Sequence, residues 1–242
     1  MKNKFLILAI FMMISSGCAE NSSSLVIVQN QSPETSCTAS NTVADNFISH
    51  GILDLGAARY NITPQYYGWF VIENNLTSTI ESHGIELNNV EIKEAHIDLS
   101  LAQAGGTLGS DITQFADYTF VTIPPGETRS VQVNLIPPNV AQRLTISSGQ
   151  FIEVFAKVQL IGERGGTEIV TNSINFPVTL CYGCLVENIG PCDTATFPEI
   201  IEQGHSCNMS QDLKLHCCYD SNSADADNPY RCPAVEGTTT VE

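Results

Sequence analysis

The nine cysteines are the residues of this chain whose type and spacing offer the most chemistry. Cys18 ends an apolar leader, and the other eight form an even set, which in an oxidising compartment favours disulfides over metal ligation. Seven of the eight lie after residue 180, so one bond must join Cys37 to the C-terminal quarter, while the connectivity stays open. The cysteines predicted to pair are Cys37, Cys181, Cys184, Cys192, Cys207, Cys217, Cys218 and Cys232.

Two alternatives use subsets of these cysteines. Cys181-Tyr-Gly-Cys184 has the C-x-x-C spacing of redox sites, but those sites start a helix within a βαβ unit, and here the motif follows predicted strands. Cys181, Cys184 and Cys207 with His205 or His216 have ligand types that zinc accepts. The even count and the oxidising compartment argue against zinc, and the missing helix argues against redox catalysis.

An acidic stretch near the C-terminus carries the hard oxygen ligands that calcium prefers. Asp220, Asn222, Asp225 and Asp227 are the candidates. The spacing departs from an EF-hand loop, which needs glycine at the place of Asp225 and a distal glutamate where Arg231 stands. We favour a solvated acidic loop and keep calcium-dependent adhesion as an alternative.

Aromatic residues are densest in the segment QYYGWF. Tyr67 and Trp69 share one strand parity, so an exposed pair could stack on sugar rings, as in carbohydrate-binding sandwiches. The alternative, which we favour, is that Trp69 covers a sheet edge or a loop. The five histidines are far apart, and no nucleophile elbow or phosphate-binding glycine loop is present. The sequence therefore predicts no catalytic residue, no cofactor and no enzyme activity.

The N-terminus has the features of an export signal. Lys2 and Lys4 precede an apolar run over 5–14 that would span about 15 Å as a helix, about half of a hydrocarbon core. The next residues, Ser15-Ser16-Gly17-Cys18, resemble the lipobox of bacterial lipoproteins, except that Ser15 stands where the family usually has leucine. The resemblance implies a signal peptide over 1–17 and acylation of Cys18, and Ala19 implies sorting to the outer membrane. Cleavage after Ala19 and plain secretion are the alternative.

Composition limits the possible partners. The net charge is −16, and it becomes more negative when Lys2 and Lys4 leave with the leader. Such a chain is repelled by nucleic acid, so no nucleic-acid partner is predicted. The anchor would make the membrane one partner, and an envelope protein or glycan another.

The remaining chain predicts an all-β protein. Residues 18–36 are small and polar and predict a flexible tether. Residues 37–180 alternate in strand periodicity and predict about seven strands in an antiparallel sandwich. In VEIKEAHIDLSL the apolar parity changes, which predicts a β-bulge near Lys93-Glu94. The PPGET turn followed by alternating valines resembles the Ig-like sandwich modules of exported bacterial proteins.

Residues 181–242 predict a loop-dominated appendage that needs disulfides to stay folded. Cys217 and Cys218 should point to different partners, since a bond between neighbours strains the peptide. The sequence as a whole predicts a non-catalytic, membrane-tethered envelope lipoprotein that binds protein or glycan. A protein from another class, an envelope hydrolase or redox accessory with an unidentified site, is the alternative.

Overall fold

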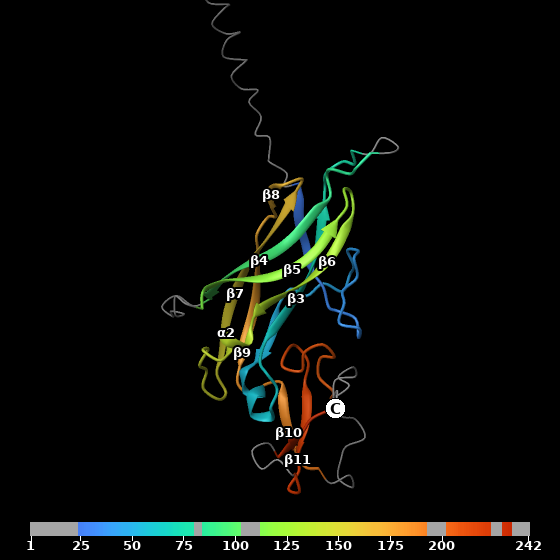
Figure 1. The fold of residues 1–242 in the computed structure, drawn as a ribbon. Helices are drawn as coiled ribbons and strands as arrows, with labels where there is room; N and C mark the ends of the chain where they lie inside the picture. The colour runs from blue at the N-terminus through green and yellow to red at the C-terminus, as the bar shows by residue number, and fades with distance from the viewer. Residues whose placement is uncertain (1–23, 80–83, 103–111, 193–201, 224–228, 234–242) are drawn as a thin grey trace, which may run out of the picture.

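The computed structural model describes residues 24–79, 84–102, 112–192, 202–223 and 229–233. The chain is all-β, as predicted: two sheets face each other, and a small third sheet lies at one end of them (Figure 1). The leader and Cys18 lie outside the described residues.

The larger sheet has six strands in the order β2-β9-β7-β4-β5, with β8 paired to β7. The predicted antiparallel arrangement holds for every neighbouring pair except β2–β9, which is parallel. The strands are β2 (Gly51–Asp54), β4 (Val90–Leu101), β5 (Gln114–Ile123), β7 (Phe151–Arg164), β8 (Thr167–Val170) and β9 (Ile174–Cys181).

The smaller sheet has the order β1-β3-β6 and is antiparallel throughout. It consists of β1 (Leu25–Asn30), β3 (Tyr66–Asn74) and β6 (Thr128–Ile136). β1 lies inside the segment predicted as a flexible tether, so that prediction is wrong from Leu25 onward. Leu25 and Ile27 are buried in the core, and their burial together with the ladder to β3 orders the segment.

One apolar core joins the inner faces of the two sheets. Val131, Val133 and Leu135 of β6 are buried, which confirms the alternation predicted for that strand. On β7, Val154, Ala156, Val158 and Leu160 are buried, whereas Ile152 is partly exposed. Facing sheets with alternating inward residues are the sandwich solution, because each half-apolar sheet needs the other to exclude water.

The predicted β-bulge is confirmed. The register of β4 shifts between Ile92 and Glu94 against both of its neighbours, β5 and β7. Val90 and Ile92 before the shift and Ala95 after it are all buried, although their parities differ. The extra residue therefore returns the apolar side chains to the core face.

Two short helical segments connect the strands. η1 (Leu55–Tyr60) follows β2 directly, and Asp54 caps its first turn. α2 (Pro138–Ala141) follows β6 and has a proline in its first turn.

The C-terminal region has a sheet of its own, in addition to the predicted loops. β10 (Val186–Pro191) pairs in parallel with β11 (Leu215–Tyr219), and β12 (Tyr230–Arg231) pairs antiparallel with β11. A separate apolar cluster supports it: Ala57, Tyr60, Ile62, Val186, Leu215 and Cys217. This region lies at the end of the sandwich opposite β8 (Figure 1).

Candidate functional site

The eight cysteines predicted to pair form four disulfides. Cys217 bonds to Cys232 and Cys218 bonds to Cys192, so the two neighbours point to different partners, as predicted. Both bonds tie β11 to the segments beside it. The small sheet buries few apolar side chains, so these cross-links supply much of its stability.

The predicted long-range link is the Cys37–Cys207 disulfide, which spans 170 residues. It lies against Trp69, whose indole nitrogen donates to the carbonyl oxygen of Cys37 at 3.3 Å. His205 stacks on the indole with ring centroids 5.8 Å apart. Trp69 is only 2% exposed, so Tyr67 and Trp69 do not form an open stacking surface. The exposed aromatic pair expected for glycan binding is therefore absent at these two residues, and Trp69 packs against the loops that carry Cys37 and His205, in line with the alternative that it contacts a loop.

Polar side chains from the C-terminal region dock on the start of β3. The Gln211 side chain accepts from the Tyr67 amide at 3.0 Å and donates to its carbonyl at 3.3 Å. Ser210 and Asn208 are buried too, and both donate to the carbonyl of Gln65. Amide and hydroxyl groups buried with partners hold a segment in one register. The segment 205–213 therefore serves as a cover for β3.

Asp212 continues this cover on the inner side. Its Oδ1 accepts from the Ile52 amide at 2.8 Å, and its Oδ2 accepts from the Tyr66 hydroxyl at 3.1 Å. Burial raises the pKa of Asp212, and burial also raises that of Tyr66. Both groups have protein partners and lie inside the fold, so they join the C-terminal region to β2 and β3.

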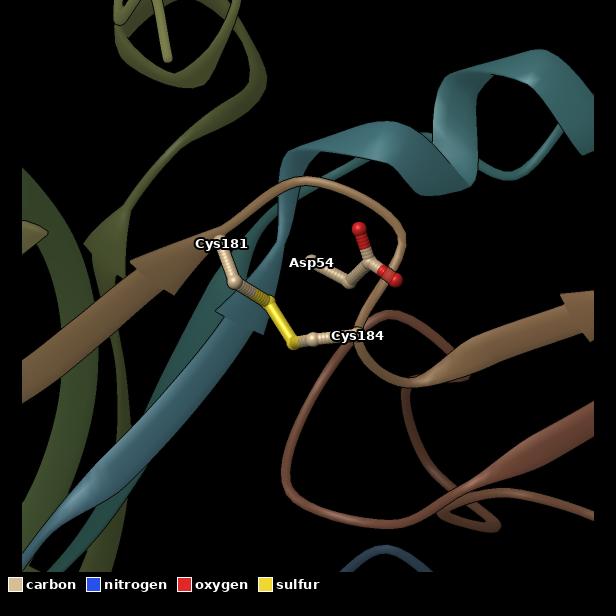
Figure 2. A group of neighbouring side chains, drawn as sticks. All are labelled: Asp54, Cys181 and Cys184. Atoms are coloured by element: carbon tan, nitrogen blue, oxygen red, sulfur yellow. A yellow bond between two sulfur atoms is a disulfide. The ribbon is translucent and has the colours of Figure 1, made fainter. Parts of the chain in front are cut away.

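A second junction surrounds the C-x-x-C segment. Cys181 and Cys184 are bonded to each other, and the carboxylate of Asp54 lies beside the bond (Figure 2). Asp54 is fully buried and accepts four backbone hydrogen bonds. The donors are the amides of Gly56 (2.8 Å) and Gly183 (2.7 Å) at Oδ1 and of Leu185 (2.9 Å) and Val186 (3.0 Å) at Oδ2.

The side chains at this junction come close enough to suggest a metal site. Ligand atoms of Asp54, Cys181 and Cys184 lie within 4.8 Å of one another. Both sulfurs are used in the disulfide, and both carboxylate oxygens are used by amides. The cluster therefore closes the turn between β9 and β10 and starts η1, rather than presenting ligands.

The zinc alternative is wrong for the described residues, because all three of its cysteines are in disulfides. Its histidines are also engaged: His205 Nδ1 accepts from the Cys207 amide, and His216 Nδ1 accepts from the Glu202 amide. Burial lowers the pKa of His205, which keeps the ring neutral against Trp69. The C-x-x-C segment occupies a loop, not the start of a helix, so the helix dipole that activates redox thiols is missing from this part of the described chain.

Two of the calcium candidates, Asp225 and Asp227, lie outside the described residues. Asp220 pairs with Arg231 at 2.5 Å and accepts from the Asn222 amide at 2.9 Å. These contacts explain how the turn after β11 is held. Calcium binding therefore stays the alternative to a solvated acidic loop.

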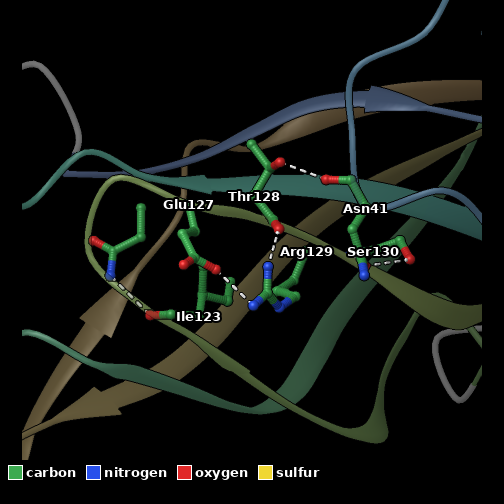
Figure 3. Close-up of polar contacts among 7 residues, drawn as sticks. Asn41, Ile123, Glu127, Thr128, Arg129 and Ser130 are labelled. Atoms are coloured by element: carbon green, nitrogen blue, oxygen red, sulfur yellow. Dashed lines mark hydrogen bonds and ion pairs between the residues drawn. The ribbon is translucent and has the colours of Figure 1, made fainter.

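The β6 edge of the smaller sheet is covered by polar groups of a neighbouring segment and of β5. Asn41 accepts hydrogen bonds from the Ser130 amide at 2.8 Å and from the Thr128 hydroxyl (Figure 3). Farther along β6, the backbone N–H of Asn134 donates to the carboxylate of Asp117 of β5 at 2.7 Å. Side chains thus satisfy amides that an edge strand would otherwise offer to another chain.

The outer face of the larger sheet is open in contrast. Tyr118 and Phe120 point outward from β5 and are 75% and 79% exposed. They border a shallow groove of about 540 Å³ over β5, β4, β7 and β8. Lys93 and Glu163 form an ion pair across it. Exposed aromatic side chains beside charged groups are typical of the centre and rim of binding surfaces.

Sequence reasoning missed the Tyr118–Phe120 pair, since both parities of DYTFVTI carry apolar side chains.

Comparison of the sequence with known protein families and with curated proteins finds no match. Within the described part of the chain, no helix has the length and apolar character needed to cross a bilayer.

Proposed function

We propose that this protein is a non-catalytic envelope lipoprotein, anchored in the outer membrane through acylated Cys18, whose Ig-like sandwich binds another envelope protein. The exposed Tyr118–Phe120 pair is the observation that carries the proposal. Tyrosine and phenylalanine are enriched in the cores of protein interfaces, where few residues supply most of the binding energy. A rigid sheet presents both rings without a cost in loop ordering.

The buried polar groups of the described residues support a binding role over a catalytic one. Asp54, Asp212 and His205 have the environments in which catalytic groups are found. Each of them instead completes a junction between the sandwich and the C-terminal region. Catalysis needs a group that can reach a substrate, and these three face backbone amides, hydroxyls and rings of the chain itself.

The anchoring half of the proposal rests on the resemblance of Ser15-Ser16-Gly17-Cys18 to a lipobox. Eight cysteines in disulfides agree with an exported protein and leave Cys18 as the ninth. A Cys18→Ser variant should lose detergent-phase partitioning, while its disulfides stay intact.

The binding half is tested by photo-crosslinking in intact cells. A photoreactive residue at Tyr118 should give a discrete crosslinked protein, and one at Phe151, which is exposed at the other end of the same sheet, should not. Tyr118→Ala with Phe120→Ala should abolish a crosslink made from nearby Thr122. Equal crosslinking from both sites, or crosslinks that survive the double variant, would contradict a specific surface. Retention of the wild-type chain on a glycan array with loss in the double variant would instead assign a glycan to this surface.

A further inference from the structure

The point at which the chain enters the sandwich lies close to its proposed anchor. Ser24 precedes β1, and its carbonyl accepts from the Asn75 amide at 2.8 Å. Ser24 follows Cys18 by six residue steps, and a fully extended chain of that length reaches about 20 Å. Because β1 is a strand and not a tether, the end of the sandwich that holds Ser24 must stay within that distance of an acyl anchor.

An exposed apolar tip lies at this same end. Ile85 and Leu87, in the connection from β3 to β4, are 85% and 62% exposed. Asn88 ties the connection to the strand end, since it donates to Thr77 at 2.7 Å and its carbonyl accepts from Asn74 at 2.9 Å. The tip and the entry of the chain are therefore held on neighbouring residues, at the end of the sandwich where β8 lies (Figure 1).

The tip has the reverse of the usual polarity of a surface loop. Glu86, between the two apolar residues, turns toward the other arm of the connection and accepts from the Ser78 hydroxyl at 2.6 Å and the Thr79 hydroxyl at 2.8 Å. These hydrogen bonds, that from Ser78 first, lower the pKa of Glu86 to about 2. The carboxylate thus fixes the loop while both apolar side chains face outward.

Acidic side chains near this end are partly neutralised. Glu127 pairs with Arg129 at 2.6 Å, at the turn before β6 (Figure 3). Glu163 pairs with Lys93 on the neighbouring sheet. These ion pairs reduce the repulsion that an acidic chain experiences at a lipid surface.

We propose that the Ile85 and Leu87 side chains enter the interfacial region of the bilayer that holds Cys18, so that the sandwich stands on its β8 end. This orientation rests on the proposed anchoring. The tip supplies apolar area at the depth where monotopic proteins bury it, and the short tether keeps it there. The disulfide-rich region then lies at the end farthest from the membrane.

The test uses the single free thiol of the non-acylated mature chain. Coupling Cys18 to a maleimide lipid in phosphatidylcholine–phosphatidylethanolamine vesicles fixes the anchor whether or not cells acylate it. Leu87→Trp then reports on the tip, with the buried Trp69 as a constant background. Leu213→Trp is the matched control, because Leu213 is an exposed leucine in the C-terminal region. Ile85→Trp serves as a second reporter if Leu87→Trp alters the near-UV circular dichroism.

The expected result is a blue shift of the tryptophan at 87 and its quenching by brominated lipid, with neither effect at 213. Adding Ile85→Asp to Leu87→Trp should reverse both. Unquenched emission at 87 in protein that floats with the vesicles would overturn the inference, as would a blue shift that depends on protein concentration without lipid, which indicates self-association. The anchoring proposal is tested separately by mass spectrometry of the native protein, and it fails if Cys18 carries no acyl mass.

Discussion

The sandwich and the C-terminal region of this molecule are held together by different forces. The sandwich buries a large apolar core between two sheets. The C-terminal region shares a six-residue apolar cluster with η1 and Ile62, has three of the four disulfides within it, and docks polar side chains on β3. Apolar burial stabilises in proportion to area, and a small domain has little area to bury. We therefore expect the C-terminal region to lose its structure when the disulfides are reduced, and the sandwich to keep its own.

Complete reduction should give the largest effect. Without disulfides, the amides of β10 and β11 should exchange with solvent on the time scale of unprotected peptide, while those of β4 and β7 stay protected. Each disulfide contributes about 2–4 kcal/mol, so the loss of three of them removes a large part of the stability of a region with a small apolar cluster. Hydrogen exchange followed by mass spectrometry measures both regions in one sample. Simultaneous loss of protection in both regions would show that the sandwich depends on the disulfides as much as the C-terminal region does.

Phe70→Ala tests the sandwich. Phe70 is fully buried in the shared core, so the variant should lose about 3–5 kcal/mol of unfolding free energy. Tyr118→Ala is the control, because an exposed side chain away from the core changes stability by about 0.5 kcal/mol or less. Denaturant titration followed by circular dichroism distinguishes them. Equal losses of unfolding free energy in the two variants would mean that the Tyr118 side chain is packed against other residues rather than exposed.

Asp54→Asn tests the junction between the regions. The amide leaves one oxygen to accept and places an NH₂ group against backbone donors, so the expected loss is about 2–3 kcal/mol. The exposed pair of Glu127 and Arg129 provides the control, and Glu127→Gln should cost less than about 1 kcal/mol. A stability like that of the wild type in Asp54→Asn would show that the turn at Gly183 is held by the disulfide alone.

His205 should give the smallest effect, and it depends on pH. Burial lowers its pKa in the folded state, so the unfolded chain binds the proton more readily. Stability that is present above the ordinary histidine pKa, about 6.5, should therefore decline as the pH falls through it. Denaturation followed by the fluorescence of Trp69 measures this slope between pH 7.5 and 5.5. His205→Phe should reduce the slope, and an unchanged slope would assign it to other groups.

The sequence predicted what depends on local patterns. The parity change in VEIKEAHIDLSL predicted the bulge in β4, and the alternation in TRSVQVNLI predicted the buried face of β6, because strand periodicity maps directly to a face. The even cysteine count predicted that Cys37 reaches the C-terminal quarter, since parity does not depend on the fold.

Features that depend on distant residues were not predicted. β1 is a short apolar run in a polar stretch, and its partner strand β3 lies about 45 residues away along the chain. Trp69 is buried because a segment near His205 covers it, which no local pattern indicates. Asp54 was missed since its partners are backbone amides, which leave no signature in residue type.

We propose an exported chain that is anchored through the sulfur of Cys18 and cross-linked through its other eight cysteines. Mass spectrometry of protein purified from its native membranes, alkylated before any reduction, tests it most directly. We predict an N-terminal peptide that starts at Cys18 and carries acyl mass, with the remaining eight cysteines unalkylated. An N-terminus without acyl groups, or alkylation at Cys37 and Cys207, would contradict the account.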